Sequence, residues 1–147
     1  MTQPIVYVDL DGTLTPSDVL MESCLLLLKR NVFFAFLMVV WAFKGGLYFK
    51  NQVASRVDPV LDRLPINPLV LDRLNQLKSA GHVLVLASAS VRRDVLKVAQ
   101  RVGIFDRVIA TEHENLKGTR KLTAIERDAN GKPFIYFGDA LVDLPIW

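Results

Sequence analysis

The amino-acid sequence predicts an α/β domain in which helices cover both faces of a mostly parallel sheet. Short apolar runs of strand length alternate with helical patterns along the chain, which is the order that a parallel sheet requires. One run, residues 83–87, is apolar at every position, as is typical of a strand buried on both faces. Asp9, Ser88 and Asp139 each follow such a run, so polar side chains collect where the strands end. We therefore expect a three-layer, Rossmann-like fold with its functional site at that edge of the sheet.

The first strand lies within residues 5–10, a β-branched and aromatic run that ends in a turn-forming Asp-Gly. Helical patterns then cover about residues 17–57, with breaks near Asn31 and at Gly45-Gly46. This stretch is an insertion between the first and second strands. We predict a core made of residues 1–16 and 66–147 and a helical cap made of residues 17–65.

The next helix should cover the sheet. Asn67 is its expected N-cap, Pro68 its first residue and Gly81 its stop signal. The apolar side chains that we expect to face the sheet are Leu69, Leu71, Leu74 and Leu77.

The second half of the chain continues the alternation. Ser90 is positioned to cap a helix over residues 91–102 that stops at Gly103. A domain of this kind normally adds another strand and helix after the last strand, whereas this chain stops at Trp147. We therefore expect the N-terminal part of a longer protein, or a minimal form of the domain. The remaining elements are a weaker strand at 107–110, a helix at 118–127, a turn at Asn130-Gly131 and a last strand at 134–137.

Composition limits the class of protein. Of the 147 residues 51% are hydrophobic, which is enough to bury the core of one domain. The single cysteine, Cys24, excludes an internal disulfide, and with no Cys or His near it in sequence it suggests neither a metal site nor a nucleophile. A reducing, cytoplasmic location fits this composition best.

Positive charge is concentrated in the cap. Between Asp18 and Arg56 five bases outnumber two acids, so this stretch alone carries +3, which equals the net charge of the chain. A nucleic-acid-binding protein would have longer basic runs, so we expect no nucleic acid as a partner. An anionic membrane surface fits an apolar, basic segment better.

The most apolar part of the cap, residues 32–43, is apolar on every side of a helix. It is shorter than the ~20 residues that span a bilayer, and Lys29, Arg30 and Lys44 flank it. We therefore predict a re-entrant or interfacial hairpin with Trp41 near the lipid headgroups. The alternative is that these side chains pack into the domain core or a dimer interface.

The loop after the first strand carries Asp9 and Asp11, followed by Gly12. An isolated Asp-Gly pair is most often only a turn. An EF-hand calcium loop is excluded, because leucines occupy positions 14 and 20, where that loop needs glycine and glutamate. The sequence Asp-Leu-Asp-Gly-Thr at residues 9–13 resembles the first motif of the haloacid dehalogenase superfamily.

Three further motifs of that superfamily have counterparts in the expected order. Ser88, after Val-Leu-Val-Leu-Ala, resembles the second motif, and Lys117, in Leu-Lys-Gly at the start of a helix, resembles the third. Gly138-Asp139 followed by Asp143 resembles the fourth. Taken singly, a serine after a strand or a lysine before a helix carries little information. Taken together the motifs cover essentially the whole chain, and the spacing is typical of members with a helical cap between the first two.

The resemblance implies a Mg²⁺-dependent phosphohydrolase. Asp9 would attack phosphorus and become transiently phosphorylated, and Asp11 would act as general acid and then general base. The implied phosphoryl-binding residues are Gly12, Thr13, Ser88 and Lys117, and the implied Mg²⁺ ligands are Asp9, Asp11, Asp139 and Asp143.

Two of these assignments have alternatives. Lys121, one helical turn after Lys117, could take the third-motif role, and Ser90 could replace Ser88. We favour Lys117 because it lies at the loop-to-helix junction, and Ser88 because it directly follows the strand. Asp18 and its neighbour Ser17, at the mouth of the cap, would either contact the substrate or cap a helix.

Asp11 also argues for phosphate chemistry, because dehalogenases of the superfamily lack the second aspartate. The run that begins at Glu22 and the ending that begins at Gly138 resemble the N-terminal phosphatase domain fused to bacterial membrane prenyltransferases of the 4-hydroxybenzoate polyprenyltransferase type. This similarity implies a lipid-linked or sugar phosphate as substrate and a membrane prenyltransferase as partner. A phosphotransferase or phosphomutase would keep every motif. A non-catalytic docking module for the prenyltransferase would not require Asp9, Asp11 and Lys117.

Overall fold

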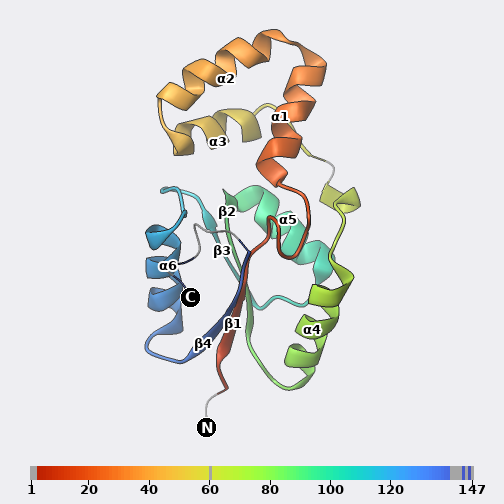
Figure 1. Cartoon of the computed structure of the whole chain (residues 1–147), viewed down its shortest axis with the longest axis vertical. Coiled ribbons are helices and arrows are strands. Elements are labelled where there is room, and N and C mark those ends of the chain that lie inside the picture. Colours follow the sequence, from red (N-terminus) through yellow and green to blue (C-terminus); the bar gives the residue numbers. More distant parts are fainter. Residues whose placement is uncertain (1–2, 60, 140–143, 145, 147) are drawn as a thin grey trace.

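The computed structural model describes residues 3–59, 61–139, 144 and 146. In this part of the chain a parallel sheet has the strand order β3-β2-β1-β4 (Figure 1). The predicted α/β fold with a parallel sheet is confirmed. The strands are β1 (Ile5–Val8), β2 (Leu84–Val91), β3 (Arg107–Thr111) and β4 (Phe134–Phe137).

Strand β1 lies in the middle of the sheet, with Val8 level with Leu86 of β2 on one side and Phe137 of β4 on the other. All pairs are parallel, so the carboxyl ends of the strands point to the same edge of the sheet. The helices of the core are α4 (Pro68–Ser79), α5 (Arg92–Val102) and α6 (Thr119–Ala129).

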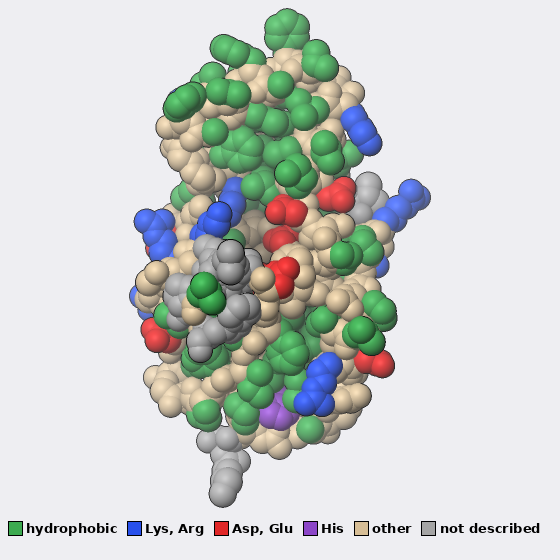
Figure 2. All heavy atoms as spheres, in the orientation of Figure 1, with side chains coloured by type: hydrophobic (Ala, Val, Ile, Leu, Met, Phe, Trp, Pro, Cys, Tyr) green, Lys and Arg blue, Asp and Glu red, His purple; other side chains and the backbone are tan. Residues whose placement is uncertain are grey.

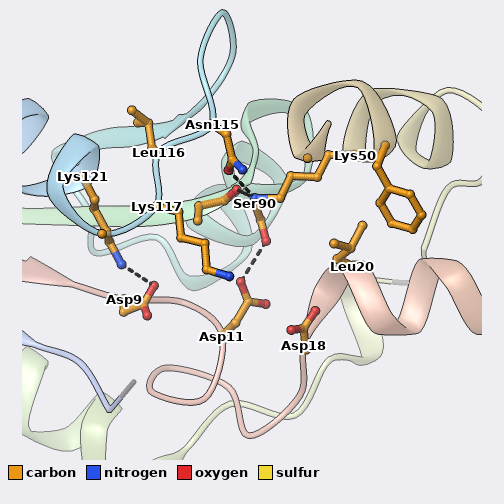
Figure 3. A pocket seen from close by; sticks show the side chains of 14 residues that line it. Asp9, Asp11, Asp18, Leu20, Lys50, Ser90, Asn115, Leu116, Lys117 and Lys121 are labelled. Atoms are coloured by element: carbon orange, nitrogen blue, oxygen red, sulfur yellow. Dashed lines mark hydrogen bonds and ion pairs between the residues drawn. The ribbon is translucent and has the colours of Figure 1, made fainter. Parts of the chain in front are cut away.

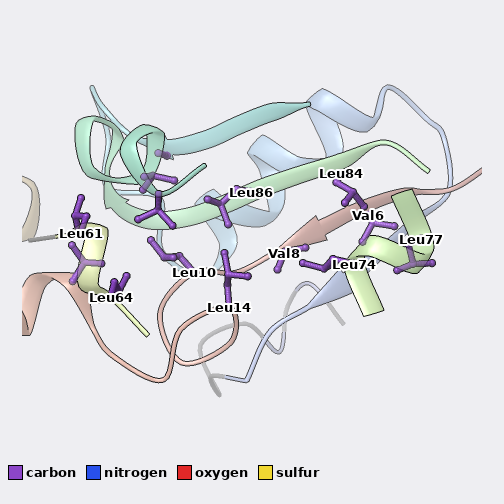
Figure 4. Close-up of a cluster of buried hydrophobic side chains, with 14 residues drawn as sticks. Val6, Val8, Leu10, Leu14, Leu61, Leu64, Leu74, Leu77, Leu84 and Leu86 are labelled. Atoms are coloured by element: carbon purple, nitrogen blue, oxygen red, sulfur yellow. The ribbon is translucent and has the colours of Figure 1, made fainter. Parts of the chain in front are cut away.

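These helices form two layers because alternate residues of a strand point to opposite faces of the sheet. Val6 and Val8 of β1 belong to the buried cluster that includes side chains of α4 and α5 (Figure 4). Ile5 and Tyr7 belong to the cluster that includes Ile125 of α6. The alternation within one four-residue strand therefore produces the three layers that the sequence predicts.

Helix α4 begins as predicted, with Pro68 as its first residue. The Asn67 side chain accepts hydrogen bonds from the backbone N–H of Leu69 at 3.1 Å and of Val70 at 3.5 Å. The predicted apolar face is wrong at Leu69, which is 80% exposed. Val70 takes its place beside Leu74, because residues four apart share a helix face. Leu69 precedes Val70 by one residue, so its side chain is rotated about 100° around the helix axis, away from that face.

The start of α5 differs from the prediction that Ser90 caps it. Strand β2 continues to Val91, which is the N-cap and makes no side-chain capping bond. Ser90 instead lies within the strand, and its hydroxyl donates to Asp11. The helix ends as predicted at Gly103, which has the left-handed φ of 75°.

The cap consists of helices that break where the sequence indicates. Asn31 ends the first helix, and its side chain accepts a hydrogen bond of 2.9 Å from Phe33 N–H at the start of the second. Gly45, with φ 106°, separates the second from the third. Figure 1 shows the cap beyond the edge of the sheet at which the strands end. The helices are α1 (Val19–Arg30), α2 (Phe33–Phe43) and α3 (Gly46–Ala54), followed by the short helix η1 (Leu61–Arg63).

The cap has a small apolar core of its own. Leu27, Trp41 and Val53, one from each helix, are buried against one another. Trp41 is only 5% exposed, and the guanidinium of Arg56 lies 4.7 Å from the centre of its ring. The prediction that Trp41 reaches lipid headgroups is therefore wrong, because this side chain lies on the inner stripe of α2. Among the described residues, no helix has both the length and the hydrophobicity to cross a membrane.

The α4 packing generates a paired stability prediction. Leu74→Ala should lower the free energy of unfolding by about 2–5 kcal/mol, because Leu74 is fully buried against the sheet and its truncation leaves a cavity. Leu69→Ala, on the same helix, should change it by less than about 0.5 kcal/mol. Urea denaturation followed by circular dichroism measures both. Equal losses for the two variants would contradict the orientation of α4.

Candidate active site

Asp9 lies directly after β1, at the edge of the sheet where the parallel strands end. Its backbone N–H donates to Phe137 O of β4 at 2.8 Å, so the sheet holds this residue in place. The side chain is 7% exposed, and its Oδ1 accepts a hydrogen bond of 2.8 Å from Leu10 N–H. The same oxygen lies 2.9 Å from Nζ of Lys121 (Figure 3). Asp9 is therefore a buried carboxylate whose charge is balanced by a lysine.

Asp11 is held by groups from both the core and the cap. Its Oδ1 accepts from Val19 N–H, the first residue of α1, at 2.8 Å. Its Oδ2 accepts from the hydroxyls of Ser90 at 2.8 Å and Ser88 at 3.4 Å. Burial raises the pKa of the Asp11 carboxyl, while the hydrogen bonds from Val19 and Ser90 oppose that rise. A carboxyl with a raised pKa is suited to giving and taking a proton.

Gly12 brings the loop after β1 close to the end of β4. Its φ of 78° favours glycine, and a Cβ on it would lie 2.9 Å from Cγ of Asp139. The hydroxyl of Thr13 donates to Oδ1 of Asp139 at 3.5 Å. Gly12 therefore leaves the space that the Asp139 carboxylate occupies. Asp143, the fourth predicted metal ligand, lies outside the described residues.

The oxygen atoms around this loop match the ligands that Mg²⁺ prefers. The family resemblance implies that Asp9 and Asp139 would supply carboxylates and Asp11 a backbone carbonyl, all of them hard oxygen donors. The space left by Gly12 lets the Asp139 carboxylate approach the loop that carries the other two. Among the described residues, no group of three or more His, Cys, Asp or Glu side chains is arranged to hold a metal ion. The donor set fits a hard cation with few side-chain ligands, and it does not fit a zinc site.

Both candidate third-motif lysines lie at the site. Lys117 comes from the loop before α6, and Figure 3 shows its side chain reaching toward Asp11. Lys121, on the first turn of α6, is 2% exposed and forms the ion pair with Asp9. Its Nζ also lies 5.3 Å from the ring centre of Tyr136. The structure thus brings together the two residues that the sequence offers as alternatives.

The two candidate serines have different surroundings. Ser90 lines the pocket beside the aspartates, whereas Ser88 is fully buried. The Ser88 hydroxyl accepts a hydrogen bond of 3.1 Å from Ser90 N–H in addition to its contact with Asp11. Ser90 is therefore the serine whose side chain faces the pocket, although it is the one that the sequence ranks second.

A pocket of about 470 Å³ opens between the sheet edge and the cap. The cap contributes Leu20, Phe49 and Lys50 to its wall, together with Asp18. Asp18 also caps α1, with Oδ1 accepting from Met21 N–H at 2.9 Å, so the expected capping role is confirmed, and contact with the substrate stays a prediction. The core residues that line the pocket are Asp9, Asp11, Ala89, Ser90, Asn115, Leu116, Lys117, Gly118 and Lys121, and the cap adds Gly46.

Lys50 and Asn115 line the pocket, although the sequence does not predict either as a site residue. Nζ of Lys50 donates to Ala89 O at 2.5 Å and to Oδ1 of Asn115 at 2.6 Å. Burial first, and the charge of Lys117 second, lower the pKa of Lys50. One feature of the sequence points to a role for Lys50 outside its own helix: α3 contains no acidic residue with which it could pair. Asn115 lies in a loop, and nothing in the neighbouring sequence distinguishes it.

Comparison with known proteins agrees with this geometry. The sequence matches the haloacid dehalogenase-like hydrolase family over residues 6–146. The chain belongs to this family. The protein y4nM of Sinorhizobium fredii (strain NBRC 101917 / NGR234), itself uncharacterized, is 32% identical over 149 residues, which cover 95% of this chain and 27% of the relative. The chain thus spans about a quarter of the length of that curated relative.

Solved structures share the fold. The haloacid dehalogenase family hydrolase t0658 of Salmonella enterica serovar Typhi aligns with a TM-score of 0.71 and 16% identity, over 97% of this chain and 58% of its own. A protein of Haemophilus somnus 129PT described as a predicted phosphoglycolate phosphatase aligns with a TM-score of 0.61 and 18% identity, over 99% of this chain and 81% of its own. At these identities the likeness establishes the fold alone.

The raised pKa of Asp11 generates a prediction for this hydrolase. A carboxyl whose pKa is raised in the folded state binds its proton more tightly there than in the unfolded chain. The free energy of unfolding therefore falls as pH rises from the pKa of the unfolded chain through the higher pKa of the folded state. Asp11→Asn removes the charged form. It should therefore raise the melting temperature at pH 7, and the gain should shrink as pH falls toward the ordinary range of aspartate.

Calorimetry from pH 4 to pH 8 measures this difference, and Asp72→Asn on the exposed side of α4 is the matched control. An Asp11→Asn variant less stable than the wild type at pH 7 would show that hydrogen bonding to the carboxylate outweighs its desolvation.

Proposed function

We propose that this protein is a Mg²⁺-dependent phosphohydrolase that acts through an aspartyl phosphate on Asp9. One observation carries the proposal: Asp9 and Asp11 line the same pocket in different electrostatic surroundings. Asp9 is ion-paired with Lys121, which favours the charged form needed in a nucleophile. Asp11 has a raised pKa, which favours the protonated form needed in a general acid. Two nearby carboxyls in surroundings that favour different protonation states are what an acid and a nucleophile require.

The proposed reaction has two steps. The Asp9 carboxylate attacks phosphorus, the bond to the leaving oxygen breaks, and Asp11 gives its proton to that oxygen. Asp11 then takes a proton from a water molecule as the water attacks the aspartyl phosphate. This second step releases inorganic phosphate and restores the Asp9 carboxylate. Each proton that Asp11 gives is thus returned within the cycle.

Positive and hydrogen-bonding groups around Asp9 would hold the phosphoryl oxygens. Lys117 and Lys121 supply charge from the start of α6, and the Ser90 hydroxyl lines the pocket beside them. Ser88 would act through Ser90 and Asp11, with which its hydroxyl makes hydrogen bonds. Thr13 and the Gly12 backbone complete the loop around the phosphoryl group, as the family resemblance implies.

Mg²⁺ would be held by the carboxylates of Asp9 and Asp139 and the backbone carbonyl of Asp11, with Asp143 in support. When bound, the ion would neutralise charge on the phosphoryl oxygens. Lys121 already balances one carboxylate of this group, which lowers the repulsion among the acids before any cation binds.

The cap is the source of substrate selectivity in this proposal. Leu20 and Phe49 give the pocket an apolar side, and Lys50 adds a third lysine to Lys117 and Lys121. A phosphate ester with both an apolar and a polar part fits this wall, and a lipid-linked phosphate is such a compound. A sugar phosphate would use the polar groups of the wall alone. A phosphotransferase or phosphomutase would use the same residues, and product analysis separates it from a hydrolase. The prenyltransferase partner implied by the sequence resemblance belongs to the same proposal.

Substitution of the nucleophile tests the proposal. Asp9→Asn should reduce Mg²⁺-dependent phosphate release by about 10³-fold or more, because the amide cannot attack phosphorus. The amide oxygen still accepts a hydrogen bond from Lys121, so the circular dichroism spectrum should persist while the melting temperature falls. Phosphate release across sugar, nucleotide and isoprenoid phosphates is the assay, with Asp72→Asn as control. Retention of most of the wild-type rate would exclude the covalent mechanism.

Metal affinity provides a second, independent test. Asp139→Ala should weaken Mg²⁺ binding by more than the 10–100-fold that a supporting residue typically contributes, because it removes a carboxylate ligand. Asp143→Ala should stay within that range. Titration calorimetry with Mg²⁺ alone measures both without substrate. Equal losses would show that the two aspartates hold the ion in the same way.

A further inference from the structure

The outer surface of α2 is apolar and exposed. Its exposed side chains include Val32 (76%), Phe33 (75%), Phe36 (70%), Val39 (56%) and Phe43 (88%). Figure 2 shows hydrophobic side chains over the end of the molecule formed by the cap. We call the set made of Val32, Phe33, Phe36, Leu37, Val39, Val40 and Phe43 the outer face of α2.

This exposure is a property of α2 and not a gap in the packing of the cap. Phe34, Met38 and Trp41 recur every three or four residues and fill the stripe that faces α1 and α3. The outer face occupies the rest of the helix surface, and α2 lies at the end of the molecule farthest from the sheet (Figure 1). A contiguous exposed patch of large apolar side chains marks an interaction site.

The charged residues of the cap segment that carries the outer face, residues 23–57, are all basic. From Ser23 to Val57 the sequence contains five basic residues and no acidic one. Lys50 is directed into the pocket and Arg56 lies over the Trp41 ring. The remaining bases, Lys29, Arg30 and Lys44, are exposed and lie at the two ends of α2.

We propose that the outer face of α2 docks on the surface of an anionic lipid bilayer, with its phenylalanines in the acyl region and Lys29, Arg30 and Lys44 against the lipid phosphates. An apolar helix face bordered by bases has the composition of helices that lie in the plane of the interface. Helix α2 has 11 residues, too few to cross the hydrocarbon core, so it rests on the membrane.

Charge decides between a bilayer and a second copy of the chain. Two caps packed face to face would bring the basic ends of both α2 helices together without an acidic residue to offset them. An anionic bilayer supplies negative charge and an apolar interior in one surface. The proposal does not depend on catalysis, because no residue of the outer face lines the active-site pocket.

Vesicle co-sedimentation with the whole 147-residue chain tests the proposal. Binding is measured on vesicles of phosphatidylcholine alone and on vesicles that also contain roughly 30–40% of the anionic lipid phosphatidylglycerol. Each measurement is made at low and at high salt, because salt screens the attraction between the bases and an anionic surface. We expect strong binding only to the anionic vesicles, weakened by salt. The combined substitution Phe36→Glu and Phe43→Glu should reduce it by about tenfold or more. Gln in place of Lys29, Arg30 and Lys44 should cost about fivefold for each base.

Leu69→Glu is the matched control, because Leu69 is as exposed as the phenylalanines but lies on α4 of the core. It should leave binding unchanged. Melting curves verify that each variant is folded, and light scattering gives the mass in solution. A protein that stays in the supernatant with anionic vesicles at low salt would overturn the proposal. If the wild-type chain is a dimer in solution and the combined substitution Phe36→Glu and Phe43→Glu dissociates it, the proposal would be overturned, and the occupant of the outer face would be a second copy of the chain.

Discussion

The hydrogen bond from Asp9 N–H to Phe137 O holds the end of β1 beside the end of β4, and these two strand ends carry Asp9 and Asp139 of the candidate site. Strands β1 and β4 are neighbours in register, although Asp9 and Asp139 are 130 positions apart in the sequence. Because both residues follow the last paired positions of their strands, their side chains emerge at the same edge. Gly12 then allows the loop to pass close to Asp139 where any side chain would collide with it. This pair of strands therefore sets the spacing of the two aspartates around which the other site residues are arranged.

Bringing acidic residues to one edge has an electrostatic cost that lysines from several elements offset. Lys121 of α6 is buried against Asp9, Lys117 lies at the start of the same helix, and Lys50 arrives from the cap. The lysines repel one another as well, and the lowered pKa of Lys50 has the charge of Lys117 among its causes. The pKa of Asp11 is raised and that of Lys50 is lowered from their ordinary values. Such a site stabilises the fold less than an apolar core would, and it is typical of catalytic sites.

Local sequence patterns were sufficient for most of the fold and for the order of the site motifs. The Asn67 and Gly103 caps are local features, and the structure confirms them. The predicted end of the second strand at Ala87 is wrong, because β2 continues through Ser88 to Val91. Errors occurred where tertiary contacts decide. Leu69 is as apolar as Leu74, and only the position of the sheet relative to α4 distinguishes them. Ser90 is a good capping residue, but its hydroxyl bonds to Asp11, which is distant in sequence. Lys50 was missed for the same reason, because its partners lie in other elements.

The contacts of Asp11 connect the position of the cap to the chemistry of the core. One oxygen accepts from Val19 N–H at the start of α1, and the other accepts from Ser90 on β2. A hydrogen bond to a carboxylate favours its charged form, so loss of the Val19 contact would raise the pKa of Asp11 further. Lys50 makes a second connection between α3 and the core through Ala89 and Asn115. The cap therefore cannot move away from the pocket without breaking the bond from Val19 to Asp11 or the bonds from Lys50 to Ala89 and Asn115. The position of the cap and the pKa of Asp11 are thus coupled through the hydrogen bond from Val19.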